Sequence, residues 1–126
     1  MAAIDEGRRP SGAEAPPGLR DGPLRVSQTA GALPVLRASG AVDLNGHDDW
    51  GRALRTAPLH DGELHLDLTD LAFIDMRGIT VLVDVAQRLP EGARIVVHRP
   101  PPCFGRMMEV LWPGGVEAIT VKGDAP

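Results

Sequence analysis

The sequence contains few aromatic residues, a single cysteine and no long apolar run. Only 3% of its 126 residues are aromatic and tyrosine is absent, so the core must be built mainly from aliphatic side chains. A lone cysteine, Cys103, excludes an internal disulfide and is typical of a reducing cytoplasm. No apolar run approaches the ~20 residues that a membrane span needs, and the N-terminus has no hydrophobic signal region. We therefore expect a cytoplasmic protein with no membrane partner.

An excess of positive charge is also missing. The formal net charge is −4, whereas a nucleic-acid partner favours a basic stripe interleaved with aromatics, so we expect no nucleic acid to bind. With 43% hydrophobic and 24% charged residues, the composition is typical of one soluble globular domain. Residues 1–22 mix Gly, Pro, Ala and charges without periodicity, which predicts a disordered tail and a folded domain over residues 23–122.

The spacing of apolar residues predicts strands and helices in the order β-β-α-β-α-β-α-β. The first two strands are separated by a short turn at Gly31 and should form a hairpin. The first helix is expected to run from an Asn45 cap to about Thr56. The second follows residue 75, and the third begins near Pro102. The expected strands lie at residues 23–29, 33–40, 63–68, 93–98 and 116–121.

The third of these strands decides the fold class. Its sequence, ELHLDL at residues 63–68, alternates strictly between leucines and polar side chains. A strand buried between two helical layers would be apolar on both faces, whereas this one has a polar face that we expect to be solvated. The sequence therefore predicts an α/β fold in which a mixed sheet of four or five strands carries its helices mainly on one face.

The stretch AFIDMRGITVL, residues 72–82, joins that strand to the second helix. Asp75 lies where a helix N-cap belongs, and its carboxylate is expected to accept the free amides two and three residues later. Gly78 lets the chain enter the helix close to neighbouring backbone. Arg77 has no such local role, because a cation in the first helical turn opposes the helix dipole by ~0.3–1 kcal/mol.

Helical spacing places a run of side chains on one outward stripe of the second helix. Val81 and Val85 make this stripe partly apolar, so both a solvated face and a contact surface stay open. The stripe consists of Arg77, Thr80, Val81, Asp84 and Arg88.

The stretch LHLDLTDLAFIDMRGITVLVDVAQRLPEGARIVVHRPPP resembles the STAS domain, the fold of bacterial anti-sigma factor antagonists. In that family a strand ending in Asp-Leu-Ser/Thr is followed by an apolar triplet, and Asp-Ser-Ser/Thr-Gly then opens an aliphatic helix. The resemblance runs from about Leu24 to Val121 and is most specific between Leu64 and Val97. It implies a STAS-like α/β fold.

The same resemblance implies a function by protein contact and no catalysis. In the family, an antagonist docks this helix and the preceding loops onto a kinase-like anti-sigma factor, which then releases its sigma factor. Phosphorylation of the serine after the aspartate blocks docking. The expected partner is thus an anti-sigma factor or another kinase-like regulatory protein, and the sequence leaves a homodimer open. The residues expected to bind the partner are Asp75, Met76, Arg77, Gly78, Thr80, Val81 and Asp84.

The position of the phosphoacceptor is where this chain departs from the family. Met76 directly follows Asp75 in place of the serine, and a thioether cannot accept a phosphoryl group. The usual off-switch is therefore missing at this position. Thr69 and Thr80 are the candidate secondary phosphorylation sites, although a turn-forming role is favoured for Thr69 because it follows the third strand.

No motif supports a metal, a cofactor or a catalytic site. His65 and His98 could share the polar face of adjacent strands with Asp67, but no compact ligand spacing supports a metal there. His47 and His60 are expected on the surface. No phosphate-cradling Gly-rich pattern is present, and no Ser-His-Asp order or acid pair suggests catalysis.

Two other classes of protein are alternatives to this hypothesis. A phosphorylated receiver domain has an acidic pair directly after its first strand, whereas this strand ends in Gln28 and Thr29, so the receiver is rejected. A sensor or scaffold STAS module, which binds a small ligand or assembles in a signalling complex, stays open as the alternative.

Overall fold

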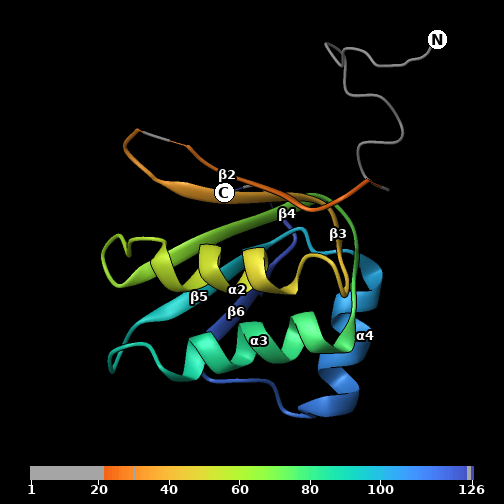
Figure 1. Ribbon diagram of the computed structural model, residues 1–126. Coiled ribbons are helices and arrows are strands. Elements are labelled where there is room, and N and C mark those ends of the chain that lie inside the picture. The colour runs from red at the N-terminus through yellow and green to blue at the C-terminus, as the bar shows by residue number, and fades with distance from the viewer. Residues whose placement is uncertain (1–21, 30, 125) are drawn as a thin grey trace, which may run out of the picture.

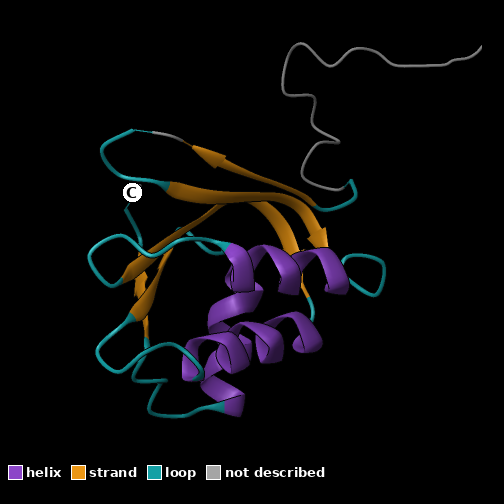
Figure 2. Cartoon of the chain, turned by 60° about the vertical axis from the view of Figure 1, so that its left-hand side comes forward, coloured by secondary structure: helices purple, strands orange, loops and turns teal. Residues whose placement is uncertain are grey.

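The computed structural model describes residues 22–29, 31–124 and 126, and these form one sheet covered on one side by helices (Figures 1 and 2). The predicted order of elements is confirmed. The expected tail, residues 1–22, lies almost entirely outside the described residues. The elements are β2 (Arg25–Thr29), β3 (Val35–Val42), α2 (His47–Thr56), β4 (Glu63–Ile74), α3 (Met76–Gln87), β5 (Arg94–His98), α4 (Pro102–Leu111) and β6 (Ile119–Lys122).

The sheet has five strands in the order β2-β3-β4-β5-β6. The hairpin strands β2 and β3 are antiparallel, and β3, β4, β5 and β6 run parallel to one another. This confirms the predicted mixed sheet. Because β3 and β4 are parallel neighbours, their carboxyl ends meet at one edge of the sheet, where α2 and α3 begin. None of the helices in the described part of the chain is long and apolar enough to cross a membrane.

Strand β4 is much longer than the expected residues 63–68, and its pairing with β3 contains two bulges. At each bulge β4 has one extra residue, which reverses the phase of the side chains that follow. Leu68, Leu71 and Ile74 are therefore all buried on the helical side although they are spaced by three residues. Thr69 lies within the strand, so the turn expected there is wrong.

The core lies between the sheet and the helices and is mainly aliphatic, as predicted. Trp50 and Phe104 are its two aromatic residues, and neither is exposed to solvent. On α4, Phe104 is buried, whereas Met107 and Met108 are half-buried. Helix α4 thus packs more loosely than α2 and α3.

The face of the sheet without helices is polar, but its centre is not solvated as expected. Asp67 is 8% exposed and His98 is 3% exposed. The Asp67 carboxylate accepts hydrogen bonds from the amide and hydroxyl of Thr69, and His65 Nδ1 lies 2.9 Å from His98 Nε2 with the two rings stacked. The cost of burying these polar groups is offset because each has a hydrogen-bond partner.

The start of α2 differs from the prediction. Gly46 occupies its N-cap position and no side chain caps the helix, so the Asn45 cap is wrong. The Asn45 amide instead donates to Asp43 Oδ1 at 3.0 Å, which closes a local turn one step earlier in the loop.

Candidate partner-docking site

The Asp75 cap predicted at the strand-to-helix joint is confirmed for one of the two expected amides, that of Gly78. Asp75 Oδ1 accepts a 2.8 Å hydrogen bond from the backbone amide of Gly78, three residues later in the sequence. The Asp75 amide donates to the Val42 carbonyl at 3.0 Å, which ties the end of β4 to the end of β3. Both the side chain and the backbone of Asp75 therefore hold the joint in place.

A histidine that we expected on the surface also binds the Asp75 carboxylate. His47, the first residue of α2, lies with its Nε2 2.9 Å from each carboxylate oxygen. The two side chains are 18% and 28% exposed. The surface assignment of His47 is wrong because β3 and β4 are neighbours, which brings the start of α2 next to the start of α3. The sequence signal for this contact is that a histidine occupies the first position of α2, the helix that follows β3.

A second residue of α2 holds the first turn of α3. Trp50 Nε1 donates a buried 2.9 Å hydrogen bond to the Gly78 carbonyl. A Cβ on Gly78 would lie 2.7 Å from Cγ1 of both Ile74 and Val42. Glycine is thus required at position 78 because core side chains pack closely against it, whereas the sequence predicts that neighbouring backbone approaches it closely. Helix α2 and the strand ends together leave the joint little room to move.

The residues expected to bind a partner differ in their exposure. Met76 is 56% exposed, whereas Gly78 is buried and Val81 is half-buried. Val85 is only 5% exposed, so it does not add to an apolar outward stripe as expected. Helix α3 contacts both α2 and α4, which widens its buried face. The exposed members of the expected set are Met76, Arg77, Thr80 and Asp84.

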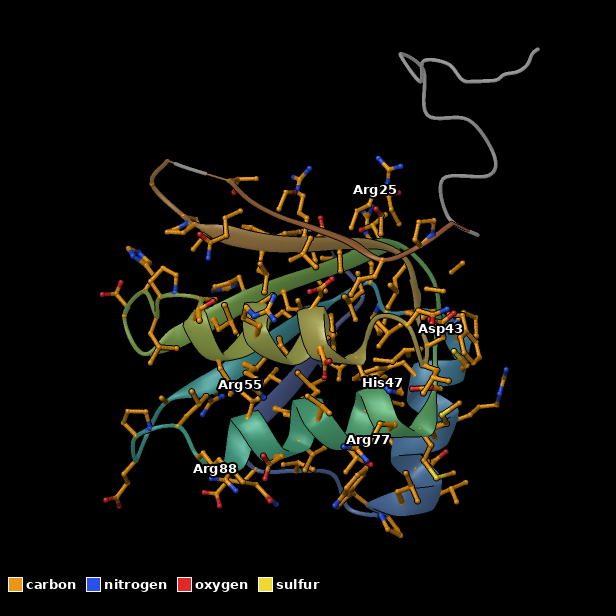
Figure 3. All side chains as sticks on the ribbon, viewed as in Figure 1. Arg25, Asp43, His47, Arg55, Arg77 and Arg88 are labelled. Atoms are coloured by element: carbon orange, nitrogen blue, oxygen red, sulfur yellow. The ribbon has the colours of Figure 1, made fainter. Side chains whose placement is uncertain are left out.

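The outward stripe of α3 is internally bonded along most of its length. Arg88 Nε donates to both oxygens of Asp84 at 3.1 Å, and Thr80 Oγ1 donates to the Met76 carbonyl at 2.9 Å. Arg77 has no ion-pair partner among the described residues. Figure 3 shows Arg77 near His47, at the opposite end of α3 from Arg88. Arg77 is therefore the cation of this stripe that is available at the joint.

The two candidate phosphorylation sites lie in different surroundings. Thr69 is half-buried in β4, and its hydroxyl donates to Asp67 at 2.5 Å. Thr80 is exposed on α3, one helical turn after Met76. Thr80 is thus the more accessible of the two, and phosphorylation of either remains a prediction.

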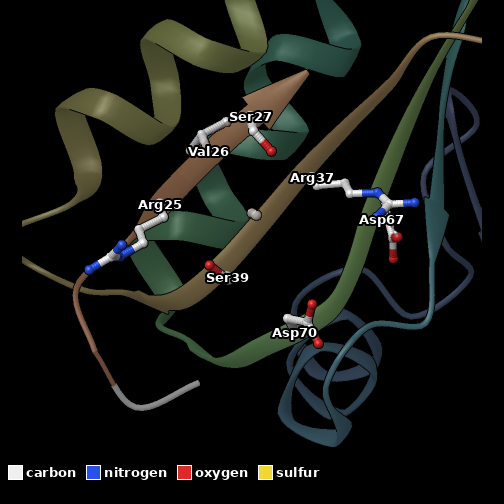
Figure 4. A pocket seen from close by; sticks show the side chains of 8 residues that line it. Arg25, Val26, Ser27, Arg37, Ser39, Asp67 and Asp70 are labelled. Carbon is white, nitrogen blue, oxygen red and sulfur yellow. Dashed lines mark ion pairs between the residues drawn. The ribbon is translucent and has the colours of Figure 1, made fainter. Parts of the chain in front are cut away.

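A small pocket lies on the helix-free face between β2, β3 and β4, with a volume of about 160 Å³ (Figure 4). Arg37 of β3 lies beside Asp67 of β4, with 3.5 Å between Arg37 Nε and Asp67 Oδ2, whereas Arg25 and Asp70 lie apart from that pair. A drug-sized ligand needs roughly 300 Å³ or more. Within the described residues, no group of three or more His, Cys, Asp or Glu side chains could hold a metal ion.

The role of Asp75 in stability gives a direct prediction. Asp75→Ala should lower the free energy of unfolding by about 1 kcal/mol, because the Gly78 amide loses its acceptor. Asp75→Asn should retain most of that stability, because asparagine caps a helix about as well as aspartate. Urea denaturation followed by circular dichroism measures both values. Equal losses for Ala and Asn would show that the carboxylate charge beside His47, and not the cap, is what matters.

Comparison with known proteins agrees with this geometry. Residues 26–115, which run from the second residue of β2 to the loop after α4 and include the whole joint, match the family described as "Mlab, STAS domain". No curated protein matches the chain. Among solved structures, the chain is similar to an anti-sigma factor antagonist from Mycobacterium paratuberculosis, with a TM-score of 0.66 and 15% identity over 81% of this chain and 87% of that chain. The protein belongs to the STAS domain family and has the fold of an anti-sigma factor antagonist.

Proposed function

We propose that this domain is a non-catalytic regulator that docks a kinase-like anti-sigma factor in the cytoplasm, in the manner of an anti-sigma factor antagonist. The observation that carries the proposal is the joint itself. Asp75 and Gly78 are held by α2 and by the strand ends, while Met76 and Arg77 between them are exposed. A rigid joint that presents two side chains is suited to binding a protein surface, because little conformational freedom is lost on docking.

The exposure of Met76 supports docking without the family's phosphorylation switch. The side chain is accessible at 56%, so a serine in its place would be accessible to a kinase, but methionine offers no hydroxyl. The phosphorylation switch is thus absent because the side chain lacks a hydroxyl group, and not because the position is buried.

This gives a prediction about phosphorylation. Incubation with each purified kinase-like anti-sigma factor of the same genome and ATP should leave residues 72–82 without phosphate, whereas Met76→Ser should become phosphorylated there. Peptide mass mapping distinguishes the two. Phosphate on Thr80 or Thr69 of the unaltered protein at high stoichiometry would show that the switch has moved to another residue.

Arg77 is the residue that we propose to select the partner. It is exposed beside the joint, it opposes the dipole of its own helix, and a guanidinium binds a carboxylate well. We therefore expect the partner to present an acidic side chain at this position.

Replacing Arg77 separates binding from stability. Arg77→Glu should leave the melting temperature unchanged or slightly raised, because an acid suits the first helical turn. It should weaken partner binding by ~2 kcal/mol or more if the pair is desolvated. Calorimetric titration against the kinase-like factor measures the affinity, and Arg88→Gln, on the same stripe at the other end of α3, is the control. Unchanged affinity of Arg77→Glu would mean that Arg77 is only a solvated charge.

One observation favours the alternative of a ligand-binding sensor or scaffold module. A hollow of about 810 Å³ lies between α4 and β6, with Phe104, Met108 and Trp112 in its lining. A small apolar ligand would find its contacts there, and titration monitored by tryptophan fluorescence would detect it. We favour docking because the exposed Met76 and Arg77 lie on a joint that the hydrogen bonds of Asp75 and Trp50 hold in place.

A further inference from the structure

Exposed apolar side chains gather around the joint. The described residues include seven large hydrophobic residues that are exposed, and three of them lie at this one end of the sheet. Leu44 is 83% exposed in the loop after β3, Phe73 is 42% exposed at the end of β4, and Met76 is 56% exposed at the start of α3. The other four are divided between the β2–β3 turn, the α2–β4 loop and the α4–β6 side.

The pairing of the strands brings these three side chains to a common place. Phe73 pairs with Ala41 of β3, and the Asp75 amide bonds to the Val42 carbonyl. Leu44 is two residues beyond Val42, while Phe73 and Met76 flank Asp75 in the chain. The three residues therefore lie within two positions of Asp75 or of Val42, its backbone partner on β3.

The fold does not need these side chains to be apolar. None of the three belongs to the core cluster or to the half-buried hydrophobic residues that pack against it. After the second bulge of β4, Ile74 is buried in the core and Phe73, two residues before Asp75, is exposed. Exposed apolar side chains grouped at one site indicate a binding surface.

We infer that Leu44, Phe73 and Met76 form the apolar centre of the docking face, and that they enter an apolar pocket of the protein partner whose rim carries the carboxylate facing Arg77. This inference rests on the proposed function and specifies the chemistry of its partner. Methionine suits such a contact because its flexible, polarisable side chain adapts to an irregular pocket. The position that carries a switch in relatives would here carry a permanent anchor.

Charge favours a different protein as the partner over two other possible occupants of an apolar surface, a second copy of this chain and a lipid membrane. In a two-fold contact with a second copy centred on Met76, the two Arg77 side chains would be brought together, and like charges would oppose the contact. An anionic lipid surface is disfavoured because the chain carries a formal net charge of −4 and Asp43 and Asp75 lie beside the patch. A pocket with an acidic rim satisfies both the apolar side chains and Arg77.

Affinity measurements on surface variants test the anchor. Met76→Gln and Phe73→Ser should each raise the Kd for the purified kinase-like anti-sigma factor by about tenfold or more, as truncation of a central apolar contact does. Met76→Leu should keep the Kd within about threefold of that of the unaltered protein, since an apolar side chain is kept. Val110→Gln is the matched control, because Val110 is 76% exposed on α4. Unchanged affinity of the first two variants, with unchanged melting temperatures, would overturn the inference and leave the proposed function intact.

A cross-linking experiment in cells separates failure of the inference from failure of the proposed function. A photoreactive benzophenone amino acid replaces Phe73 or, as control, Val110, and adducts are identified by mass spectrometry. An adduct with the kinase-like factor at residue 73 alone supports both proposals. An adduct with another regulatory protein at residue 73 alone supports the anchor and overturns the proposed function. Adducts with a second copy or with lipid, or none at all, overturn the anchor.

Discussion

Trp50→Ala is expected to lower the free energy of unfolding by about 4 kcal/mol, within the range found for emptying a large core site. Trp50 is completely buried under the sheet, and its indole N–H is hydrogen-bonded to the Gly78 carbonyl. The substitution therefore leaves a cavity and a buried carbonyl without its donor, and the second effect alone costs about 1–3 kcal/mol. Urea denaturation followed by circular dichroism measures the loss.

Two further variants identify the origin of that loss. Trp50→Phe keeps most of the apolar volume and removes the N–H, so it should lose about 1–3 kcal/mol. Trp112→Ala is the control, because Trp112 is only half-buried at the end of α4 and should lose less than half as much as Trp50→Ala. Similar losses for the two alanine variants would show that Trp50 has no special role at the joint.

Gly78→Val is expected to lower the free energy of unfolding by about 3 kcal/mol, at the upper end of overpacking effects. Its Cβ would lie 2.7 Å from Cγ1 of Ile74 and of Val42. Both neighbours are branched core side chains with no exposure, so neither can turn away. Gly78→Ala should also destabilise, by about 1–2 kcal/mol, although alanine is the better helix former.

A second glycine in a helix provides the opposite expectation. A Cβ on Gly105 of α4 would meet no atom within 4 Å. Gly105→Ala should therefore raise the free energy of unfolding by about 0.5–1 kcal/mol through helix propensity alone. If Gly78→Ala also stabilised the protein, the packing at the joint would be looser than these contacts indicate.

The parts of the site that follow from local rules could be predicted from the sequence. The Asp75 cap depends on residues within three positions of it, and the order of elements depends on short apolar patterns. The confirmed mixed sheet follows from that order, because right-handed crossovers make consecutive strands parallel neighbours.

The parts that depend on neighbouring elements could not be predicted in this way. His47 reaches Asp75 across 28 positions of the chain, through the pairing of β3 with β4. Val85 is buried because α3 lies between two other helices, which a single helix pattern does not reveal. The extension of β4 beyond Leu68 does not follow from the sequence, because apolar residues spaced by three do not have the period of a strand.

The two bulges of β4 also matter for how such a chain can change its length during evolution. In a regular strand, one inserted or deleted residue turns every later side chain to the wrong face. In β4 the extra residues near Thr69 and Ala72 lie opposite no partner of their own in β3, so a change of one residue there is absorbed locally. Leu71 and Ile74 would keep their buried faces, and the docking joint would keep its orientation. Gaps between related sequences should accordingly fall at these two places and not in the regular pairing from Glu63 to Asp67.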